Sequence, residues 1–276
     1  LGADCLLYPA LAAWDQDPSL GSLKLLHAWG AKGPFTTTLT LLLTLLVGAA
    51  PVGARLLSVL AHAAVMALAF SLGRKLSGRA TAGLWSALLC GAAPLLFGWA
   101  RLEYPEMVLA VLVLGAIQLV LRDRLDRPLP ALALGVLFGL GIMTKLAFIA
   151  FMVVPGLWLL VRHLRGPRPG ALYGLALTLA SMGMTAGPWI AINRESIYTN
   201  FFSSSTTSDL SVLDKVADYL GLLGVAPLLG AAAVAMLLLW RGERTRRDCL
   251  LLMGMFVACS MFLFMVVFDS WSRYIV

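Results

Sequence analysis

The sequence predicts an all-α, polytopic transmembrane helical bundle, and three observations support this fold class. Hydrophobic residues make up 60% of the 276 residues and charged residues only 13%, about half the charged share of soluble domains. Long apolar runs alternate with short charged loops, and about 20 apolar residues suffice for a helix to cross the hydrocarbon core. The basic residues collect in alternate loops, as the positive-inside rule requires of a membrane protein.

Eight apolar runs are candidate membrane spans. In chain order they are Arg55–Gly73, Ala82–Ala100, Glu103–Leu121, Leu129–Lys145, Ala147–Val161, Gly170–Ile192, Tyr219–Trp240 and Cys249–Phe268. The fourth and fifth are short for a crossing and predict a tight helical hairpin.

Four loops between these runs are strongly basic. Their cations are Arg74, Lys75, Arg79, Arg122, Arg124, Arg127, Arg162, Arg165, Arg168, Arg241, Arg244, Arg246 and Arg247. These loops are predicted to be cytoplasmic, and the other ends of the spans to face outward. The net charge of +7 therefore indicates topology, and no nucleic-acid partner is expected.

The apolar run Phe35–Ala50 is too short to cross the membrane comfortably. Its 16 residues would form a helix of roughly 24 Å, whereas the hydrocarbon core is about 30 Å thick. We expect an interfacial or re-entrant helix that leaves residues 4–55 outside. The predicted organisation is one domain over 1–276: an outer loop with this helix (1–54), then a helical bundle (55–276) with a second outer loop (193–218). The sequence opens on LGADC and stops at WSRYIV, which predicts a piece of a longer chain.

Ionisable residues of both signs gather at the outer rim of this predicted bundle. They are Asp4, Lys32, Arg55, Arg101, Glu103, Glu106, Lys145 and Arg273, with Tyr274 beside the last. Charges at membrane depth are costly, so each is a functional candidate. Each also has a structural interpretation, because lysines snorkel to the headgroups and carboxylates favour the first turn of a helix. His62, inside the first span, is interpreted as a neutral histidine hydrogen-bonded to a neighbouring helix rather than as a proton relay.

Cations and carboxylates at an outer membrane interface suit chemistry on a lipid-linked substrate. A polyprenyl-phosphate sugar places its phosphate at headgroup depth and its tail in hydrocarbon. Lysine and arginine would bind the phosphate and stabilise its charge as it leaves. A carboxylate would accept the proton of an acceptor group that attacks the sugar carbon.

An ordered series of short motifs carries a family resemblance over nearly the whole chain. The segments are ADCLLYP, AKGPFTTTL, ARLLSVLAHAAVMALAFSLGRKLSG, AAPLLFGWARLEYPEMVLAVLV, GLGIMTKLAFIAFMVVPGLWLL, TAGPWIAIN and SRYIV. The series resembles the GT-C fold glycosyltransferases that use polyprenyl-phosphate sugars, including protein O-mannosyltransferases and the aminoarabinose transferases that modify lipid A. The family implies a membrane-embedded active site open to the outer face.

The resemblance implies roles for individual residues. Asp4 would be the catalytic base, Lys32 and Arg273 would bind phosphate, and Glu106 or Glu103 would be a second acidic site residue. The remaining predicted phosphate-binding residues are Arg55, Arg101, Lys145 and Tyr274. The chain departs from the family pattern at Cys5, where a second carboxylate is usual, and at Lys32-Gly33-Pro34, where Lys-Pro-Pro is usual. Whether a divalent metal ion serves as cofactor is therefore left open.

These observations favour a membrane glycosyltransferase that acts by single displacement with inversion. Its expected partners are a polyprenyl-phosphate sugar, a protein, lipid or glycan acceptor, and the surrounding membrane lipids. The expected location is a bacterial inner membrane, with the active site on the periplasmic face. Two alternatives remain: a lipid or small-molecule transporter or flippase, and a non-catalytic subunit for envelope assembly.

Overall fold

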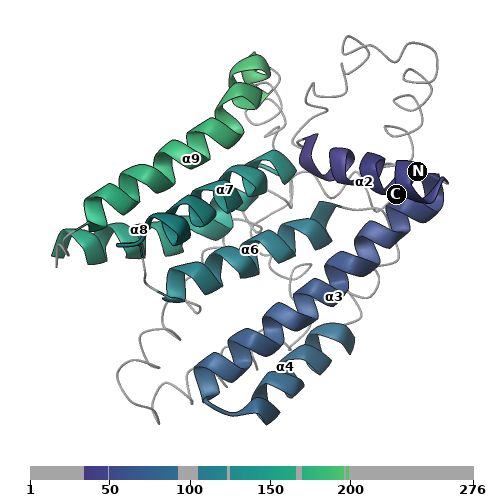
Figure 1. The fold of residues 1–276 in the computed structure, drawn as a ribbon, viewed down its shortest axis with the longest axis horizontal. Coiled ribbons are helices and arrows are strands. Elements are labelled where there is room, and N and C mark those ends of the chain that lie inside the picture. Colours follow the sequence, from purple (N-terminus) through teal and green to yellow (C-terminus); the bar gives the residue numbers. More distant parts are fainter. Residues whose placement is uncertain are drawn as a thin grey trace, which may run out of the picture.

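In a computed structural model, residues 34–48, 50–92, 105–122, 125–165, 170–195 and 197–198 can be described. Seven helices account for most of this part of the chain, and no strand occurs in it. The helices are α2 (Pro34–Val47), α3 (Ala50–Ser77), α4 (Ala80–Ala92), α6 (Pro105–Arg122), α7 (Pro128–Thr144), α8 (Phe148–Arg165) and α9 (Ala171–Ile192). The predicted all-α class is confirmed, and Figure 1 shows the helices side by side in one bundle.

Three of the described helices are long and apolar enough to cross a membrane. These segments are Arg55–Ser77, Pro105–Arg122 and Leu172–Ile192. Helices α2, α4, α7 and α8 are apolar but shorter. For α7 and α8 this agrees with the short fourth and fifth runs predicted from the sequence. The predicted spans Tyr219–Trp240 and Cys249–Phe268 lie outside the described residues, as does the second half of Ala82–Ala100.

Helices α2 and α3 form a hairpin that reverses at Gly48. This residue has a φ of 78°, a backbone conformation that glycine adopts without steric cost, and its N–H donates to the Thr44 carbonyl at 2.8 Å. The predicted helix Phe35–Ala50 therefore ends three residues earlier, because the chain turns at Gly48 and Ala50 already belongs to α3. Pro51 is then in the first turn of α3, where its missing N–H costs nothing.

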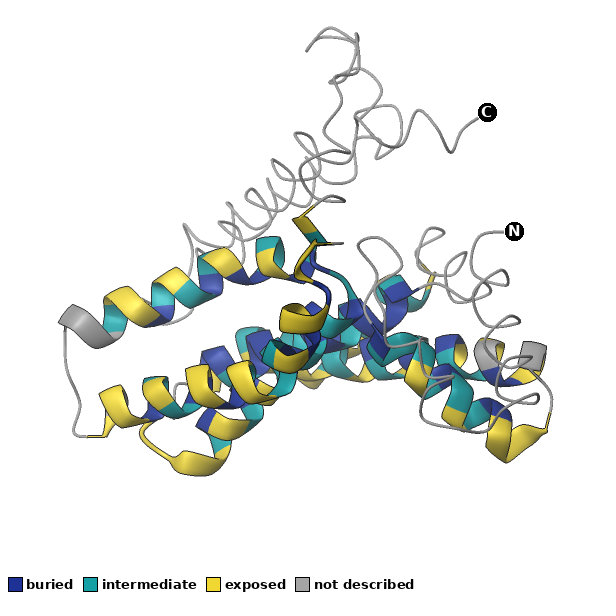
Figure 2. Ribbon diagram, turned by 90° about the horizontal axis from the view of Figure 1, so that it is seen from above, coloured by how far each residue is buried: buried dark blue, intermediate teal, exposed yellow. Residues whose placement is uncertain are grey.

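Helix α6 is the centre of the described bundle. It contacts α3, α7 and α8. Of the residues in its membrane-spanning stretch 56% are buried inside the bundle, against 28% for the corresponding stretch of α3 and 22% for that of α9. Met107, Ala116 and Val120 on α6 are fully buried. In Figure 2 the buried residues lie on the inward faces of the helices, and the exposed residues on the outer faces.

One polar contact joins α6 to α3 inside this apolar core. The Gln118 side chain donates from Nε2 to the Leu68 carbonyl at 2.9 Å, and its Oε1 lies 3.5 Å from the Ser71 hydroxyl. A buried amide in hydrocarbon has to find such partners, because no water is present to replace them. Gln118 therefore aligns α6 against the second half of α3.

Helices α7 and α9 approach closely through small residues. Gly135 and Gly139, one turn apart on α7, face Thr178, Ser181 and Thr185 on α9. The Thr178 hydroxyl donates to the Ala131 carbonyl at 3.1 Å. Small residues at this spacing let two membrane helices pack backbone to backbone. This pairing positions α7, whose C-terminal end carries a candidate site residue.

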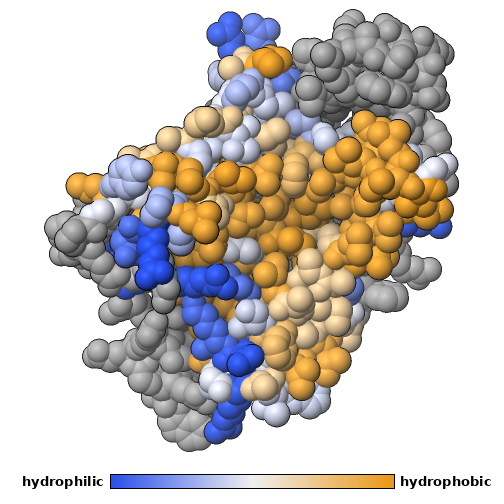
Figure 3. Space-filling view, in the orientation of Figure 1, coloured by the Kyte–Doolittle hydropathy of each residue, from blue (hydrophilic) through white to orange (hydrophobic). Residues whose placement is uncertain are grey.

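Large hydrophobic side chains cover the outside of the bundle. Trp85 on α4 is 65% exposed and Met184 on α9 is 80% exposed. Figure 3 shows a broad apolar surface, with hydrophilic residues gathered toward the lower left, where α3 and α6 end in Figure 1. Such a surface is unstable in water but suits contact with lipid tails.

Candidate active site

Glu106 lies in the first turn of α6, directly after the buried Pro105. A carboxylate here is stabilised by the positive end of the helix dipole. The proline is suited to the first helical position, because its φ is already helical and its absent N–H is not needed. The local sequence Pro105–Glu106 thus opens the helix and holds an acidic side chain at its start.

Lys145 directly follows α7 and begins the turn of three residues before α8 starts at Phe148. Its backbone is extended, with a φ of −161°. Its N–H donates to the Gly141 carbonyl at 3.1 Å, and its carbonyl accepts from the Phe148 N–H at 2.9 Å. Phe148 is buried and contacts Phe138 edge to face, with ring centroids 5.8 Å apart. The backbone that carries Lys145 is therefore held on both sides by packed structure.

The two side chains form an ion pair. The Lys145 Nζ lies 2.8 Å from Glu106 Oε1, and the side chains are 31% and 20% exposed respectively. The other carboxylate oxygen, Oε2, is buried and has no hydrogen-bond partner among the described residues. The lysine ammonium has three N–H donors, and this pair uses one. The arrangement combines a cation that can bind an anionic oxygen with a carboxylate oxygen that can accept a proton.

Helix α2, whose first turn reaches the same part of the bundle, carries a row of buried hydroxyls. Helix α2 contacts α7 as well as α3, and Figure 1 shows the beginning of α2 beside the end of α7. The hydroxyl oxygens of Thr36, Thr40 and Thr44 are buried, and none has a hydrogen-bond partner in the described part of the chain. Their spacing of four residues places them on one face of the helix. These hydroxyls were not singled out from the sequence, although the TTTLTLLLT run carries their spacing.

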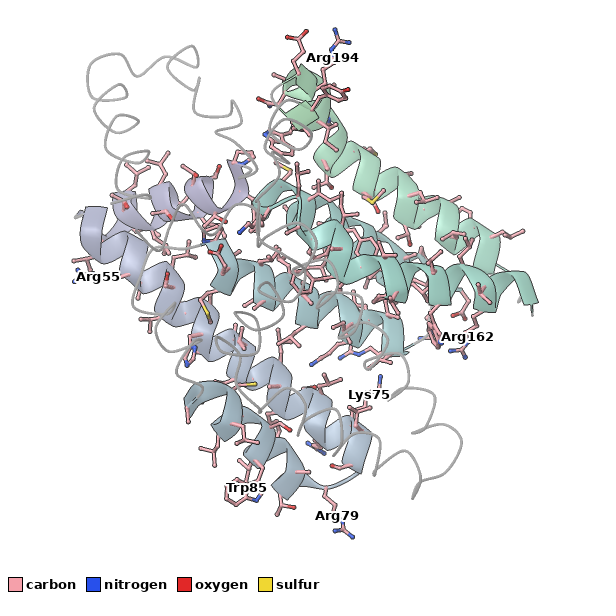
Figure 4. All side chains as sticks on the ribbon, turned by 180° about the vertical axis from the view of Figure 1, so that it is seen from behind. Arg55, Lys75, Arg79, Trp85, Arg162 and Arg194 are labelled. Atoms are coloured by element: carbon pink, nitrogen blue, oxygen red, sulfur yellow. The ribbon has the colours of Figure 1, made fainter. Side chains whose placement is uncertain are left out.

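The structure brings only part of the predicted site together. Glu106 and Lys145 are in direct contact. Arg55 is exposed and points outward from α3 in Figure 4, away from the ends of α6 and α7. The other predicted site residues lie outside the described residues: Asp4, Lys32, Arg101, Glu103, Arg273 and Tyr274.

Two further sequence expectations concern metal binding and His62. Among the described residues, no group of three or more His, Cys, Asp or Glu side chains gathers. The partner of Glu106 is a cation, Lys145, and not another potential metal ligand.

The His62 Nδ1 atom is buried without a hydrogen-bond partner in the described part of the chain. The hydrogen bond to a neighbouring helix that we expected for His62 is therefore not made by this nitrogen.

Comparison with known proteins identifies the family. The family model described as dolichyl-phosphate-mannose-protein mannosyltransferase matches residues 31–189, more than half of the chain. The chain belongs to this family. No curated protein and no solved structure matches it.

Family membership confirms the GT-C resemblance and establishes a membrane glycosyltransferase. The matched segment contains Lys32, Glu106 and Lys145, and it runs from just before α2 to near the end of α9. The Glu106–Lys145 ion pair is therefore part of the region by which this mannosyltransferase family member is identified.

Proposed function

We propose that this protein transfers mannose from a polyprenyl-phosphate-linked donor to a protein hydroxyl, on the extracytoplasmic face of a bacterial inner membrane. The observation that carries the proposal is the Glu106–Lys145 ion pair within the family-matched segment. The pair lies at the end of the bundle opposite the basic loops after α3 and α6. If those loops are cytoplasmic, as their charge predicts, the pair is at the outer interface.

The proposed role of Lys145 is to bind the donor phosphate. The donor's lipid tail lies in hydrocarbon, which places its phosphate at the level of the helix ends. Lys145 would move its ammonium from Glu106 toward a phosphate oxygen, or contact both, and stabilise the negative charge that builds on the leaving phosphate. Lys32, two residues before α2, and Arg273 would contact the other phosphate oxygens, and Arg101 and Tyr274 would complete the set. Arg55 is left out of this set, because it points away from these helix ends.

The proposed chemical step is a single displacement at the anomeric carbon. The acceptor oxygen attacks that carbon from the face opposite the phosphate. The bond from carbon to phosphate oxygen breaks, and its electron pair leaves with the polyprenyl phosphate. Because the attack comes from the face opposite the leaving phosphate, the configuration of the sugar carbon is inverted. Asp4 takes the acceptor's proton as general base. Glu106 or Glu103 would orient the acceptor or the cations.

The proposed domain organisation keeps all of these groups in one unit. Residues 1–54 would form the outer loop that carries Asp4 and Lys32, and residues 55–276 the bundle. The outer loop 193–218 would cover the site from the extracytoplasmic side.

A reconstituted transfer assay tests this function. The purified chain in lipid nanodiscs would be given radiolabelled polyprenyl-phosphate mannose and a peptide rich in serine and threonine. We expect mannosyl peptide with inverted configuration, and a rate about 10²–10⁴-fold lower for Asp4→Asn. Lys145→Gln should lower the rate about 10²-fold or more. The exposed Arg79, in the turn between α3 and α4, provides the matched charge-removal control Arg79→Gln, which should keep full activity.

Three results would contradict the proposal in distinct ways. Full activity of Asp4→Asn would exclude the assigned base. Transfer from a different lipid-linked sugar, but not from the mannose donor, would show that the assigned sugar is wrong. The proposed displacement mechanism would still apply. Movement of the lipid donor between leaflets without any sugar transfer would favour the flippase alternative.

A further inference from the structure

A second candidate site lies at the opposite end of the bundle from Glu106 and Lys145. A cavity of about 760 Å³ opens where α3 and α6 end and α7 begins. It is lined by Lys75, Leu119, Leu121, Arg122, Arg127 and Pro128–Pro130. Figure 4 shows Lys75 extending from the end of α3 toward the end of α6. Three cations from three different helix ends thus border one hollow.

The cavity lies at the depth of the lipid headgroups. Two of its walls are the ends of the spanning segments Arg55–Ser77 and Pro105–Arg122. The end of a spanning helix lies at the boundary between hydrocarbon and headgroups. Glu106 and Arg122 are 16 residues apart on α6, which separates the cavity from the ion pair by roughly 24 Å at 1.5 Å per residue. The cavity is therefore distinct from the proposed active site.

The lining combines positive charge with apolar surface. Leu129 lines the cavity together with the three cations, and its side chain is 76% exposed. Leu119 and the two prolines add further apolar lining. A small anion from water would gain nothing from these apolar groups. A phospholipid would use both parts, because its phosphate can contact the cations while its acyl chains cover the leucines.

Arg127 is the residue that ordinary helix electrostatics does not explain. Lys75 and Arg122 end α3 and α6, where cations favour the negative end of the helix dipole. Arg127 is instead the residue immediately before α7, at the positive end of that helix's dipole, where a cation is disfavoured. The nearby carboxylate of Asp126 is exposed and does not line the cavity. A bound anion would offset the repulsion at Arg127.

We infer that this cavity binds the headgroup phosphate of an anionic membrane phospholipid. Pro128 and Pro130 have no backbone N–H, so the start of α7 offers few backbone donors to an anion. Recognition would rest on Lys75, Arg122 and Arg127, and selectivity would follow headgroup charge. The bound lipid would hold the ends of α3, α6 and α7 together.

Lipid retention measured by native mass spectrometry tests the inference. The protein would be extracted from nanodiscs containing equal phosphatidylglycerol and phosphatidylcholine, and the lipids retained per protein counted. We expect preferential retention of phosphatidylglycerol, reduced at least fivefold in R122Q/R127Q. The matched control R74Q/R79Q removes two exposed cations from the same end of the bundle that do not line the cavity, and it should retain the lipid.

Equal losses in the two double variants, or no preference for the anionic lipid, would overturn the inference. Water-soluble glycerophosphoglycerol should fail to displace the lipid; displacement at equal concentration would indicate a site for a soluble anion instead. A photoreactive phosphatidylglycerol on the unmodified protein gives a measurement independent of variant folding. Its cross-links should map to the end of α3 near Lys75, to residues 119–122 or to residues 127–130, and labelling confined to other segments would exclude the site.

Discussion

Glu106 and Lys145 are joined by a 2.8 Å ion pair although 39 residues separate them in the chain. The contact connects the first turn of α6 to the residue that immediately follows α7. Both side chains are partly buried, and one carboxylate oxygen has no partner among the described residues. The pair therefore has two roles to separate by experiment: it holds two helix ends together, and it presents a cation to the proposed donor.

Exchanging the two charges should separate these roles. Glu106→Lys and Lys145→Glu each place two like charges together, and each should lower the free energy of unfolding by about 2 kcal/mol, between the values for exposed and buried pairs. The double exchange restores opposite charges and should recover most of the melting temperature. Transfer activity should stay low, because the cation would then project from α6 rather than from the end of α7.

Thermal unfolding in detergent and the mannosyl transfer assay provide the two readouts. Recovery of both stability and activity in the double exchange would show that the pair is only a structural anchor. Additive losses of stability would show that the ion pair does not form in solution.

The contact between α7 and α9 should be sensitive to a single methyl group. A Cβ at Gly135 would collide with the Ser181 hydroxyl and the Thr178 carbonyl. Gly135→Ala should therefore destabilise the protein by about 1–3 kcal/mol, although alanine is favoured over glycine inside a helix by about 1 kcal/mol.

Gly183 on α9 provides the matched control, because nothing lies within 4 Å of a Cβ placed there. Gly183→Ala should leave the melting temperature unchanged or raise it. A fall of equal size in both variants would mean that helix flexibility, rather than close packing, explains the effect of Gly135→Ala.

Removing the polar contact between α3 and α6 should have a modest effect. Gln118→Leu deletes the 2.9 Å hydrogen bond to the Leu68 carbonyl, and polar contacts of this kind in membrane proteins contribute about 0.6 kcal/mol on average. We expect a small fall in melting temperature with activity retained, since Gln118 is far along α6 from Glu106. A rise in melting temperature would show that apolar packing at this position outweighs the hydrogen bond.

Cysteine labelling should reveal which face each loop occupies. In a background without the four native cysteines, Arg79→Cys should react with a membrane-impermeant reagent from the cytoplasmic side only. Ser22→Cys and Glu195→Cys should react from the outside only. Labelling of Ser22→Cys from the cytoplasm would show that α2 crosses the membrane and would invert the placement of Lys32.

Some features of the fold follow from local sequence and were predicted correctly. The apolar runs predicted α6, α7 and α9 to within a few residues, because helix length in a membrane is set by the hydrocarbon thickness. The end of α2 was predicted at Ala50, but the chain turns at Gly48. The pattern of apolar residues does not show which glycine will adopt a positive φ, because that depends on how tightly α2 folds against α3.

Glu106 and Lys145 were named as candidate site residues from the sequence, but the contact between them was not predicted. Glu106 and Lys145 were both expected at the outer rim, in separate roles, since each stands at the end of an apolar run. Nothing in the local pattern indicates that α6 and α7 bring them within hydrogen-bond distance. The buried hydroxyls of α2 and the cavity beside Arg127 depend in the same way on neighbours distant in sequence.

The sequence by itself determined the membrane environment, the helical class and the approximate extent of most of the described helices, because hydrophobicity is a property of short segments. Only the tertiary structure decided that α6 is central, that Gly135 and Gly139 let α9 pack closely against α7, and that Glu106 forms an ion pair with Lys145. Within a membrane every helix is apolar on most of its surface, so hydrophobicity does not select neighbours. The choice is made by small residues and by a few polar contacts, whose partners lie elsewhere in the chain.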